Sequence, residues 1–178
     1  MQRDQPFLLF AIGYLCLAFN LSVNGFELLL PNLVGYALIC AASWYRRDRG
    51  ALFLAVAIVA GLLLPFGLRD FFYHAYRESF PDFGRLKLLQ TPLASLLALL
   101  VSAIVWHEAR VGRRSMLAAM AFATAPILAA SYLAAGQMAR SSNAEKIAAI
   151  LVQTIPDFYL ALLTWLAYRW LGNRRSVD

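Results

Sequence analysis

Residues 51–68 read ALFLAVAIVAGLLLPFGL, a run that contains no charged, amide or hydroxyl side chain. A helix needs about 20 mainly apolar residues to cross the hydrocarbon core of a bilayer, because each residue advances it by about 1.5 Å. Lipid also requires helix, since a backbone without water must satisfy its own hydrogen bonds. The stretch therefore predicts a membrane-spanning helix.

The rest of the chain has the same character. Its 178 residues are 61% hydrophobic and 15% charged, whereas soluble domains are about 45–50% apolar and about 25% charged. A soluble core of this size could not bury so much apolar surface. The composition predicts a membrane protein whose partner is the lipid bilayer, and it disfavours soluble enzymes and nucleic-acid-binding proteins.

Six apolar stretches predict an all-α polytopic bundle in a single membrane domain over residues 1–178. They are Pro6–Val23, Leu28–Tyr45, Ala51–Leu68, Leu86–Trp106, Met116–Ala135 and Ile147–Leu171. Few polar residues separate the first two, so five spans or a re-entrant N-terminal segment is the alternative. No small-x-small cleavage site follows residues 7–19, so we expect a retained span there rather than a cleaved signal peptide.

The basic residues form short clusters between the apolar stretches, as orientation signals do. With the N-terminus inside, 10 of the 16 Lys and Arg residues fall on the cytoplasmic side and 6 on the outer side. This bias predicts that both termini are cytoplasmic. The aromatic, charge-balanced loop at residues 69–85 weakens it, and we expect an interfacial amphipathic helix between spans 3 and 4 or, alternatively, a lid over a cavity.

The most distinctive segment is NGFELLLPNLVGY at residues 24–36, in which a proline precedes an asparagine. The same order returns as Pro156-Asp157 and as Pro81-Asp82. A polar side chain just inside a helix start accepts the free backbone N–H groups there. Helix initiation is therefore the plain alternative to a ligand or ion site.

Residues 24–36 also resemble a segment of small uncharacterised bacterial multi-pass membrane proteins, which reads approximately NG-x-D-I-L-P-D-F-I-G-Y. Glu27 and Asn32 stand here in place of its two aspartates. The resemblance implies a protein of the bacterial cytoplasmic (inner) membrane, and it carries no activity with it.

Asp157 lies near the middle of the last apolar stretch, and an ionisable group at that depth is a candidate functional residue. A ligand-binding hypothesis groups it with four others: Asn32, Glu27, Tyr36 and Tyr159. The alternative is that a neighbour satisfies its charge without any ligand. The neighbours considered are Arg140, Lys146 and Gln153.

Three functions are consistent with these features, and small-solute transport or substrate capture is the first. A non-catalytic accessory or assembly protein is the second. An intramembrane enzyme is the least favoured, because we find no His-Glu-x-x-His, no Gly-x-Ser-x-Gly and no paired-aspartate cluster. We predict no catalytic residue, no metal ligand and no cofactor.

Two further features concern packing. Cys16 and Cys40 lie inside apolar stretches without a Cys-x-x-Cys pair, so we expect small packing residues rather than redox or zinc chemistry. The fifth stretch is rich in alanine, which lets helices approach closely. It is predicted to be central in the bundle or to contact a second copy or another membrane protein.

Overall fold

A computed structural model describes the backbone of residues 5–19, 22–23, 26–27, 31–76, 88–138 and 143–172. Side chains are described at residues 5–19, 32–69, 88–135, 145, 148–149 and 151–171. All structural statements below refer to these parts of the chain.

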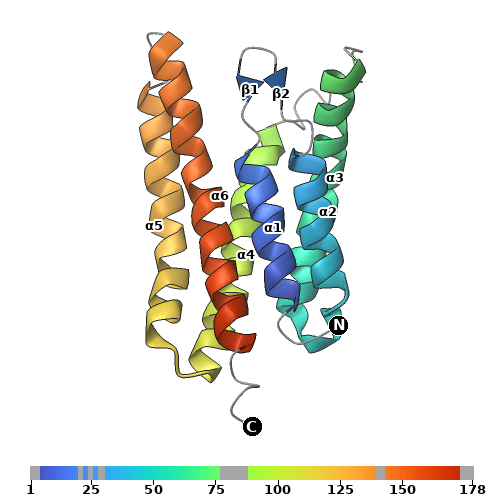
Figure 1. Cartoon of the computed structure of the whole chain (residues 1–178), viewed down its shortest axis with the longest axis vertical. Coiled ribbons are helices and arrows are strands. Elements are labelled where there is room, and N and C mark those ends of the chain that lie inside the picture. Colours follow the sequence, from blue (N-terminus) through green and yellow to red (C-terminus); the bar gives the residue numbers. More distant parts are fainter. Residues whose placement is uncertain are drawn as a thin grey trace.

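The described chain is a bundle of six α-helices, which confirms the predicted all-α class (Figure 1). The helices are α1 (Gln5–Ala18), α2 (Pro31–Trp44), α3 (Ala51–Tyr76), α4 (Gln90–Val111), α5 (Ser115–Met138) and α6 (Asn143–Gly172). Two minor elements accompany them: the 3-10 helix η1 (Arg47–Arg49), and the two-residue strands β1 (Ser22–Val23) and β2 (Phe26–Glu27). The strands pair antiparallel, Ser22 opposite Glu27, as a small hairpin.

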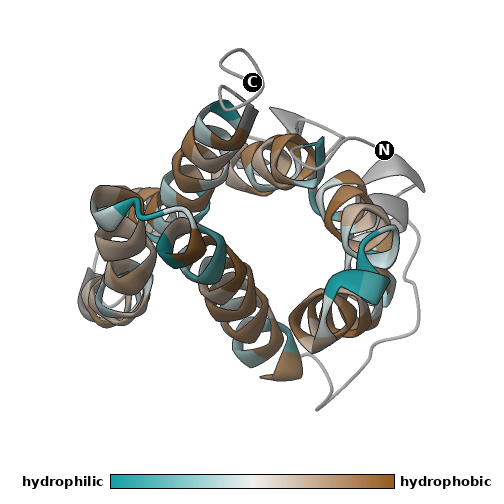
Figure 2. Cartoon of the chain, turned by 90° about the horizontal axis from the view of Figure 1, so that it is seen from below, coloured by the Kyte–Doolittle hydropathy of each residue, from teal (hydrophilic) through white to brown (hydrophobic). Residues whose placement is uncertain are grey.

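Five of the helices form a ring, and the sixth lies outside it. Each of α1, α2, α3 and α4 packs against the next, α6 packs against both α1 and α4, and α5 has α4 and α6 as its main neighbours (Figure 2). The Ala-rich α5 is therefore at the edge of the bundle. The prediction of a central position is wrong, because α5 meets the other helices along one side only.

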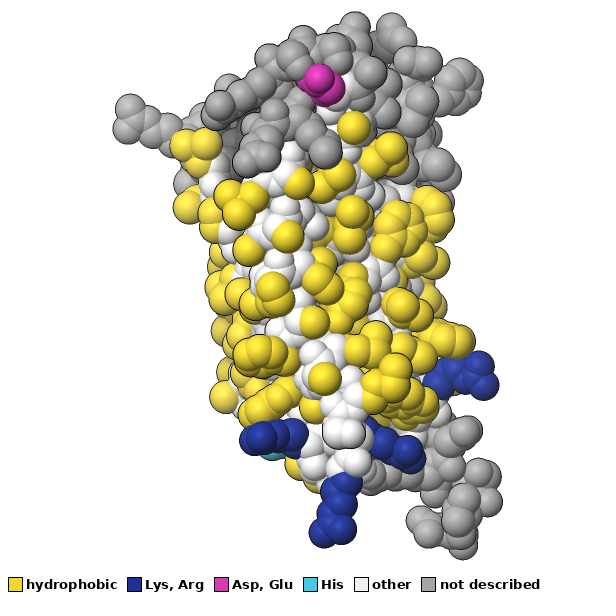
Figure 3. All heavy atoms as spheres, turned by 90° about the vertical axis from the view of Figure 1, so that its left-hand side faces the viewer, with side chains coloured by type: hydrophobic (Ala, Val, Ile, Leu, Met, Phe, Trp, Pro, Cys, Tyr) yellow, Lys and Arg dark blue, Asp and Glu magenta, His cyan; other side chains and the backbone are white. Residues whose placement is uncertain are grey.

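The core of the bundle is continuous from one end to the other. Its largest fully buried side chains include Phe10, Tyr14, Ile39, Leu63 and Leu97. The outer surface is apolar as well, and Figure 3 shows hydrophobic side chains over the middle of the visible face. Apolar residues both inside and outside a bundle are expected where lipid is the solvent.

Three helices are long and apolar enough to cross a membrane: Ala51–Arg69 within α3, Gln90–Val111 and Ser115–Ala135. The chain is therefore a membrane protein by the length and composition of its helices. This count is smaller than the six spans predicted from the sequence. The difference comes from α1, α2 and α6.

The helices α1 and α2 are shorter than the stretches predicted for them. Each has 14 residues, or about 21 Å, whereas the hydrocarbon core is about 30 Å thick. Helix α1 ends at Ala18 rather than Val23 because polar residues such as Asn20 and Ser22 follow, and the chain turns through β1 and β2. Helix α6 has 30 residues, and polar groups such as Gln153 and Asp157 lower the hydropathy of its continuously described part, residues 151–171.

The predicted interfacial helix at residues 69–85 is not a separate element where it is described. Helix α3 continues past Leu68 to Tyr76, so residues 69–76 prolong the preceding span. The remaining part of that loop, residues 77–87, lies outside the described residues. The aromatic run at residues 71–73 suits a continued helix because no Gly or Pro interrupts it.

Seven of the eight arginines with described side chains lie at one end of the bundle, where α1 begins and α6 ends (Figures 1 and 3). We call it the basic end, and it is defined by Arg46, Arg47, Arg49, Arg110, Arg113, Arg114 and Arg169. The opposite end, which carries β1, β2 and the start of α6, is the hairpin end. Arg69, on the later part of α3, is the eighth arginine.

Candidate functional site

A small polar cavity lies inside the bundle and is lined by five of its six helices. Its volume is about 70 Å³. The lining residues are Tyr14 and Leu17 on α1, Asn32 and Tyr36 on α2, Ala94, Leu97 and Ala98 on α4, Leu128 and Tyr132 on α5, and Gln153, Pro156 and Asp157 on α6. Only α3 contributes no lining residue.

Helical geometry explains why these residues meet. On α1, α2 and α5 the two lining residues are three or four positions apart, so they lie one above the other on one face. On α4 and α6 the first lining residue is followed one turn later by two adjacent ones, which on α6 are Pro156 and Asp157 after Gln153. Pro156 has no N–H, so the carbonyl of Val152 lacks its usual helical donor at the same level.

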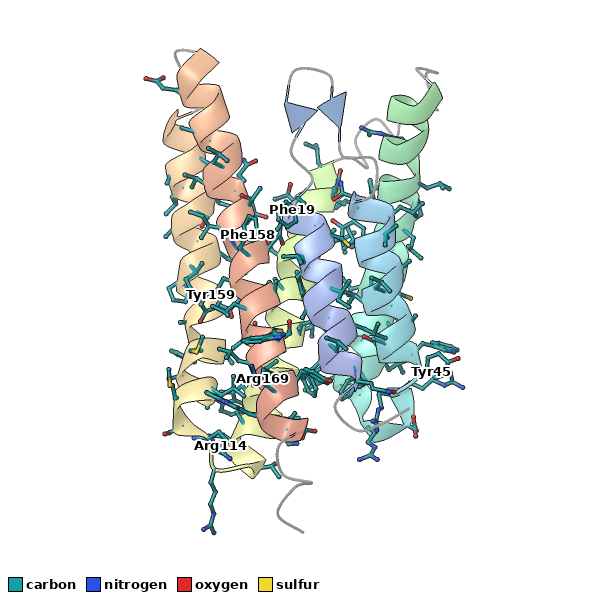
Figure 4. The ribbon with its side chains drawn as sticks, viewed as in Figure 1. Phe19, Tyr45, Arg114, Phe158, Tyr159 and Arg169 are labelled. Atoms are coloured by element: carbon teal, nitrogen blue, oxygen red, sulfur yellow. The ribbon has the colours of Figure 1, made fainter. Side chains whose placement is uncertain are left out.

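The cavity lies at the level where α1 ends. Asp157 is the fifteenth of the 30 residues of α6. Its neighbour Phe158 packs edge-on against Phe19, directly after α1, with ring centroids 5.4 Å apart (Figure 4). Because α6 extends about 20 Å beyond this level toward the hairpin end, Asp157 lies far from both ends of α6, and its side chain is half-buried.

Close helix contacts at two glycines bring the tyrosines of α1 and α2 to the cavity. A Cβ atom built on Gly35 would lie 2.8 Å from the carbonyl oxygen of Gly13, and one on Gly13 would lie 2.8 Å from Ile39 Cγ1. Only glycine permits such a close approach of two backbones. Tyr14 and Tyr36 directly follow these glycines in the sequence, so the crossing point fixes both of them.

Asn32 is held in a similar way by α3. A Cβ atom on Gly67 would lie 2.8 Å from the backbone nitrogen of Leu33 and 3.1 Å from the carbonyl carbon of Asn32. The start of α2 therefore rests directly on the backbone of α3. This contact sets the height of Asn32 relative to Asp157.

Tyr14 has the most unusual environment of the lining residues. It is 2% exposed, and its hydroxyl has no hydrogen-bond partner among the described residues. A buried hydroxyl without a partner destabilises a fold by about 1–3 kcal/mol. Because Tyr14 lines the same cavity as Asp157, a species bound in the cavity is a potential partner for its hydroxyl.

Three of the five residues in the ligand-binding hypothesis meet at this cavity: Asp157, Asn32 and Tyr36. Tyr159 does not, because its hydroxyl donates to the carbonyl oxygen of Met120 on α5. Glu27 belongs to β2, and its side chain lies outside the described residues. Whether the three bind a ligand stays a prediction.

Of the neighbours considered for Asp157, Gln153 shares the cavity with it. Arg140 and Lys146 have side chains outside the described set. Tyr14 and Tyr132 also line the cavity and were not singled out from the sequence. A single tyrosine in an apolar stretch is common at helix ends in membranes, so no pattern in the sequence distinguished these two.

The site has oxygen-rich polar chemistry with one ionisable carboxyl. The other acids with described side chains are Asp48 and Glu108 at the basic end and Glu145 in the first turn of α6. No group of three or more His, Cys, Asp or Glu residues that could hold a metal ion occurs within the described parts of the chain. Carboxylate, amide and phenol oxygens together can receive a proton or a small hard cation.

The chain matches no protein-family model, and neither the curated proteins nor the solved structures contain a match to it. The resemblance at residues 24–36 therefore stays a sequence-based expectation.

Proposed function

We propose that this chain captures or transports a small cationic solute, with Asp157 as its charged ligand. The observation that carries the proposal is that Asp157, midway along α6, lines a polar cavity together with Tyr14, Asn32 and Tyr36. A carboxylate inside a membrane protein is strongly destabilising unless a partner neutralises it. No basic residue is among the described residues that line the cavity, so a proton or a bound cation is the neutralising partner that fits.

The size of the cavity limits the solute. Pockets for drug-sized ligands have volumes of about 300–1,000 Å³, whereas this one has about 70 Å³. A cavity holds one water molecule when its volume is at least about 10–15 Å³. The cavity therefore suits a proton carried by water, or a monovalent metal ion with a few waters. This narrows the broader hypothesis of small-solute transport or substrate capture.

The proposal includes six membrane passages in the bacterial inner membrane, with both termini in the cytoplasm. It is supported by the start of α1 and the end of α6 at the same end of the bundle (Figure 1). The concentration of arginines at that end also supports it, because cytoplasmic loops are rich in Lys and Arg. In this topology α1 and α2 form the first two passages.

The test is a flux assay in proteoliposomes that contain the purified full-length chain. A pH-sensitive dye inside the vesicles reports proton entry, and separate Na⁺ and K⁺ gradients report cation movement. We expect wild-type vesicles to exceed protein-free vesicles and the Asp157→Asn variant to fall to the protein-free level. The carboxamide keeps the size of the side chain and removes its charge, so packing changes little.

The matched control is Tyr159→Phe, two residues away on α6. Its hydroxyl bonds to α5 rather than facing the cavity, so flux should remain while stability falls by about 0.5–1.5 kcal/mol. Equal flux from wild-type and Asp157→Asn vesicles would overturn the proposal, and so would the absence of any wild-type flux in all three gradients.

The second candidate is a non-catalytic accessory or assembly protein, and α5 is the observation that favours it. At the edge of the bundle this helix exposes small residues, among them Ala125, Ala129 and Ala130. Exposed small residues are typical of helix contacts in membranes. A folded wild-type protein without flux would favour this function over transport.

A further inference from the structure

We propose that the groove between α4 and α5 at the basic end binds an anionic phospholipid, with its phosphate at three arginines and one acyl chain along the helices. This site is separate from the cavity around Asp157 and is independent of the proposed transport function. Two adjoining hollows form it, of about 480 Å³ and about 280 Å³. Both are lined by Trp106 and Phe122, so one groove runs from the turn between the helices toward the middle of the bundle.

The end of the groove at the turn is strongly basic. Arg110, Arg113 and Arg114 line it, and none of its described lining residues is acidic. The guanidinium of Arg110 lies over the ring of Trp106, 4.6 Å from its centroid. Tryptophan and arginine together are typical of the headgroup level of a membrane. The groove thus offers three positive charges at the depth where lipid phosphates lie.

The turn itself holds the arginines in a fixed arrangement. Backbone hydrogen bonds of 2.9, 3.0 and 2.8 Å run from Gly112 to Glu108, from Arg113 to Arg110 and from Arg114 to Ala109. These bonds close the end of α4, and Arg113 occupies the left-handed position with φ of 54°. Glycine or asparagine is usual at that position. The first N–H groups of α5 begin directly after it and add a partial positive charge.

The remainder of the groove is apolar and has the length of an acyl chain in one leaflet. From Ser115 to Pro126 the groove follows α5 for 11 residues, which corresponds to about 16 Å. Half of the hydrocarbon core is about 15 Å thick. Ala103 and Ala125 leave room along it, and Phe122, which is 78% exposed, borders it.

Charge and shape together favour a lipid over two other occupants. A free phosphate would use only the arginines and leave the apolar part empty. A second copy of this chain would bring further apolar helix surface but would need acidic groups at the headgroup level to match the arginines. An anionic phospholipid has a phosphate that can bind the arginines at the basic end of the groove. Its acyl chain can lie along the apolar remainder of the groove.

The experiment measures binding of fluorescent phosphatidylglycerol and phosphatidylcholine to the purified full-length chain in detergent. We expect wild type to prefer the anionic lipid by at least about tenfold. The variant Arg110→Gln/Arg113→Asn/Arg114→Gln should lose that preference; asparagine is chosen because it tolerates a positive φ. Arg47→Gln/Arg49→Gln is the matched control, since these arginines also lie at the basic end but outside the groove.

A second variant tests the apolar part while all the arginines remain. Ala125→Phe fills the groove beside Pro126 and should weaken phosphatidylglycerol binding by about tenfold. Inorganic phosphate should compete poorly against the lipid in wild type. Thermal unfolding of each variant shows that the bundle is intact.

Four results would overturn the proposal. The first is unchanged lipid preference in the triple-arginine variant, and the second is an equal loss in the Arg47/Arg49 control, which would indicate general surface charge. The third is full competition by inorganic phosphate with no effect of Ala125→Phe, which would indicate a plain anion site. A wild-type dimer that Ala125→Phe dissociates without a change in lipid binding would also contradict it, because the groove would then belong to a second copy.

Discussion

Asp157 and Tyr14 line the same cavity, whose volume of about 70 Å³ admits only small species. In water neither group would be unusual. In a bundle with an apolar surface, a carboxyl group and a hydroxyl without a partner are each destabilising, since little else there can solvate them. Their occurrence together is what distinguishes this cavity from the apolar grooves on the outside of the bundle.

At the residue scale, the Tyr14→Phe variant should lower solute flux without lowering the free energy of unfolding. Because the hydroxyl of Tyr14 has no partner among the described residues, its removal should leave the free energy of unfolding unchanged or raise it by up to about 1 kcal/mol. Flux in the proteoliposome assay should fall at least severalfold if this hydroxyl contacts the solute. Thermal unfolding in detergent and flux are measured on the same preparation.

Tyr36→Phe is the comparison, since Tyr36 lines the same cavity and interacts with another residue of the protein. That change should lower stability, by about 0.5–1.5 kcal/mol. A drop in stability for Tyr14→Phe as large as that for Tyr36→Phe would show that the Tyr14 hydroxyl has a structural partner.

At the element scale, the glycines decide how α1, α2 and α3 approach one another. Gly13 and Gly35 place α1 against α2, and Gly67 places α3 against the start of α2. The atoms that a new methyl group would meet at Gly35 and Gly67 include backbone atoms, which cannot rotate away as a side chain can. The same contacts carry Tyr14, Tyr36 and Asn32 to the cavity, so packing and site geometry are linked.

Gly35→Ala should therefore destabilise the bundle by about 1–3 kcal/mol. Its added Cβ would lie 2.8 Å from the carbonyl oxygen of Gly13, and α1 and α2 would have to move apart. Gly61→Ala is the matched control on α3: its Cβ would meet only Cys40 Sγ, at 4.0 Å, and alanine favours helix over glycine by about 1 kcal/mol. The measurement is the unfolding midpoint in detergent, and equal midpoints for the two variants would contradict the close crossing.

At the scale of the whole molecule, three helices end at the basic end with an arginine stacked on a tryptophan. Arg47 lies 4.2 Å from the ring centroid of Trp44 on α2, and Arg169 lies 5.2 Å from that of Trp165 on α6. The third pair, on α4, is the one in the lipid groove. Tryptophan at the membrane interface with arginine reaching outward is a common anchoring arrangement, so these pairs mark one membrane surface.

Cysteine labelling tests the proposed orientation. In a background with Cys16 and Cys40 replaced by alanine, Ser115→Cys lies at the basic end and Glu145→Cys at the hairpin end. Both residues are exposed. We expect a membrane-impermeant maleimide to label Glu145→Cys in intact cells and Ser115→Cys only after permeabilisation. The reverse pattern would invert the orientation, and labelling of both in intact cells would contradict a bundle that crosses the membrane.

The sequence by itself determined the membrane environment, the helical class and the approximate positions of α3, α4, α5 and α6. These follow from long apolar runs, which act locally: in lipid, a backbone in such a run must form a helix whatever its neighbours are. The same reasoning failed at α1 and α2, where hydropathy averaged over polar residues that end α1 at Ala18. It also missed that α3 continues through residues 69–76.

Only the tertiary structure decided which polar groups meet. Asp157, Asn32 and Tyr36 were identified as candidates from the sequence, but their convergence depends on helix crossings set by close backbone contacts. The same crossings also place Tyr14 at the cavity. The orientation of α6 instead places the Tyr159 hydroxyl at the carbonyl oxygen of Met120. Hydropathy measures the preference of a side chain for an apolar solvent over water. It can be calculated for each segment of the chain alone. Contacts between helices depend on pairs of surfaces far apart in the chain, and for that reason the folded bundle was needed to define the site.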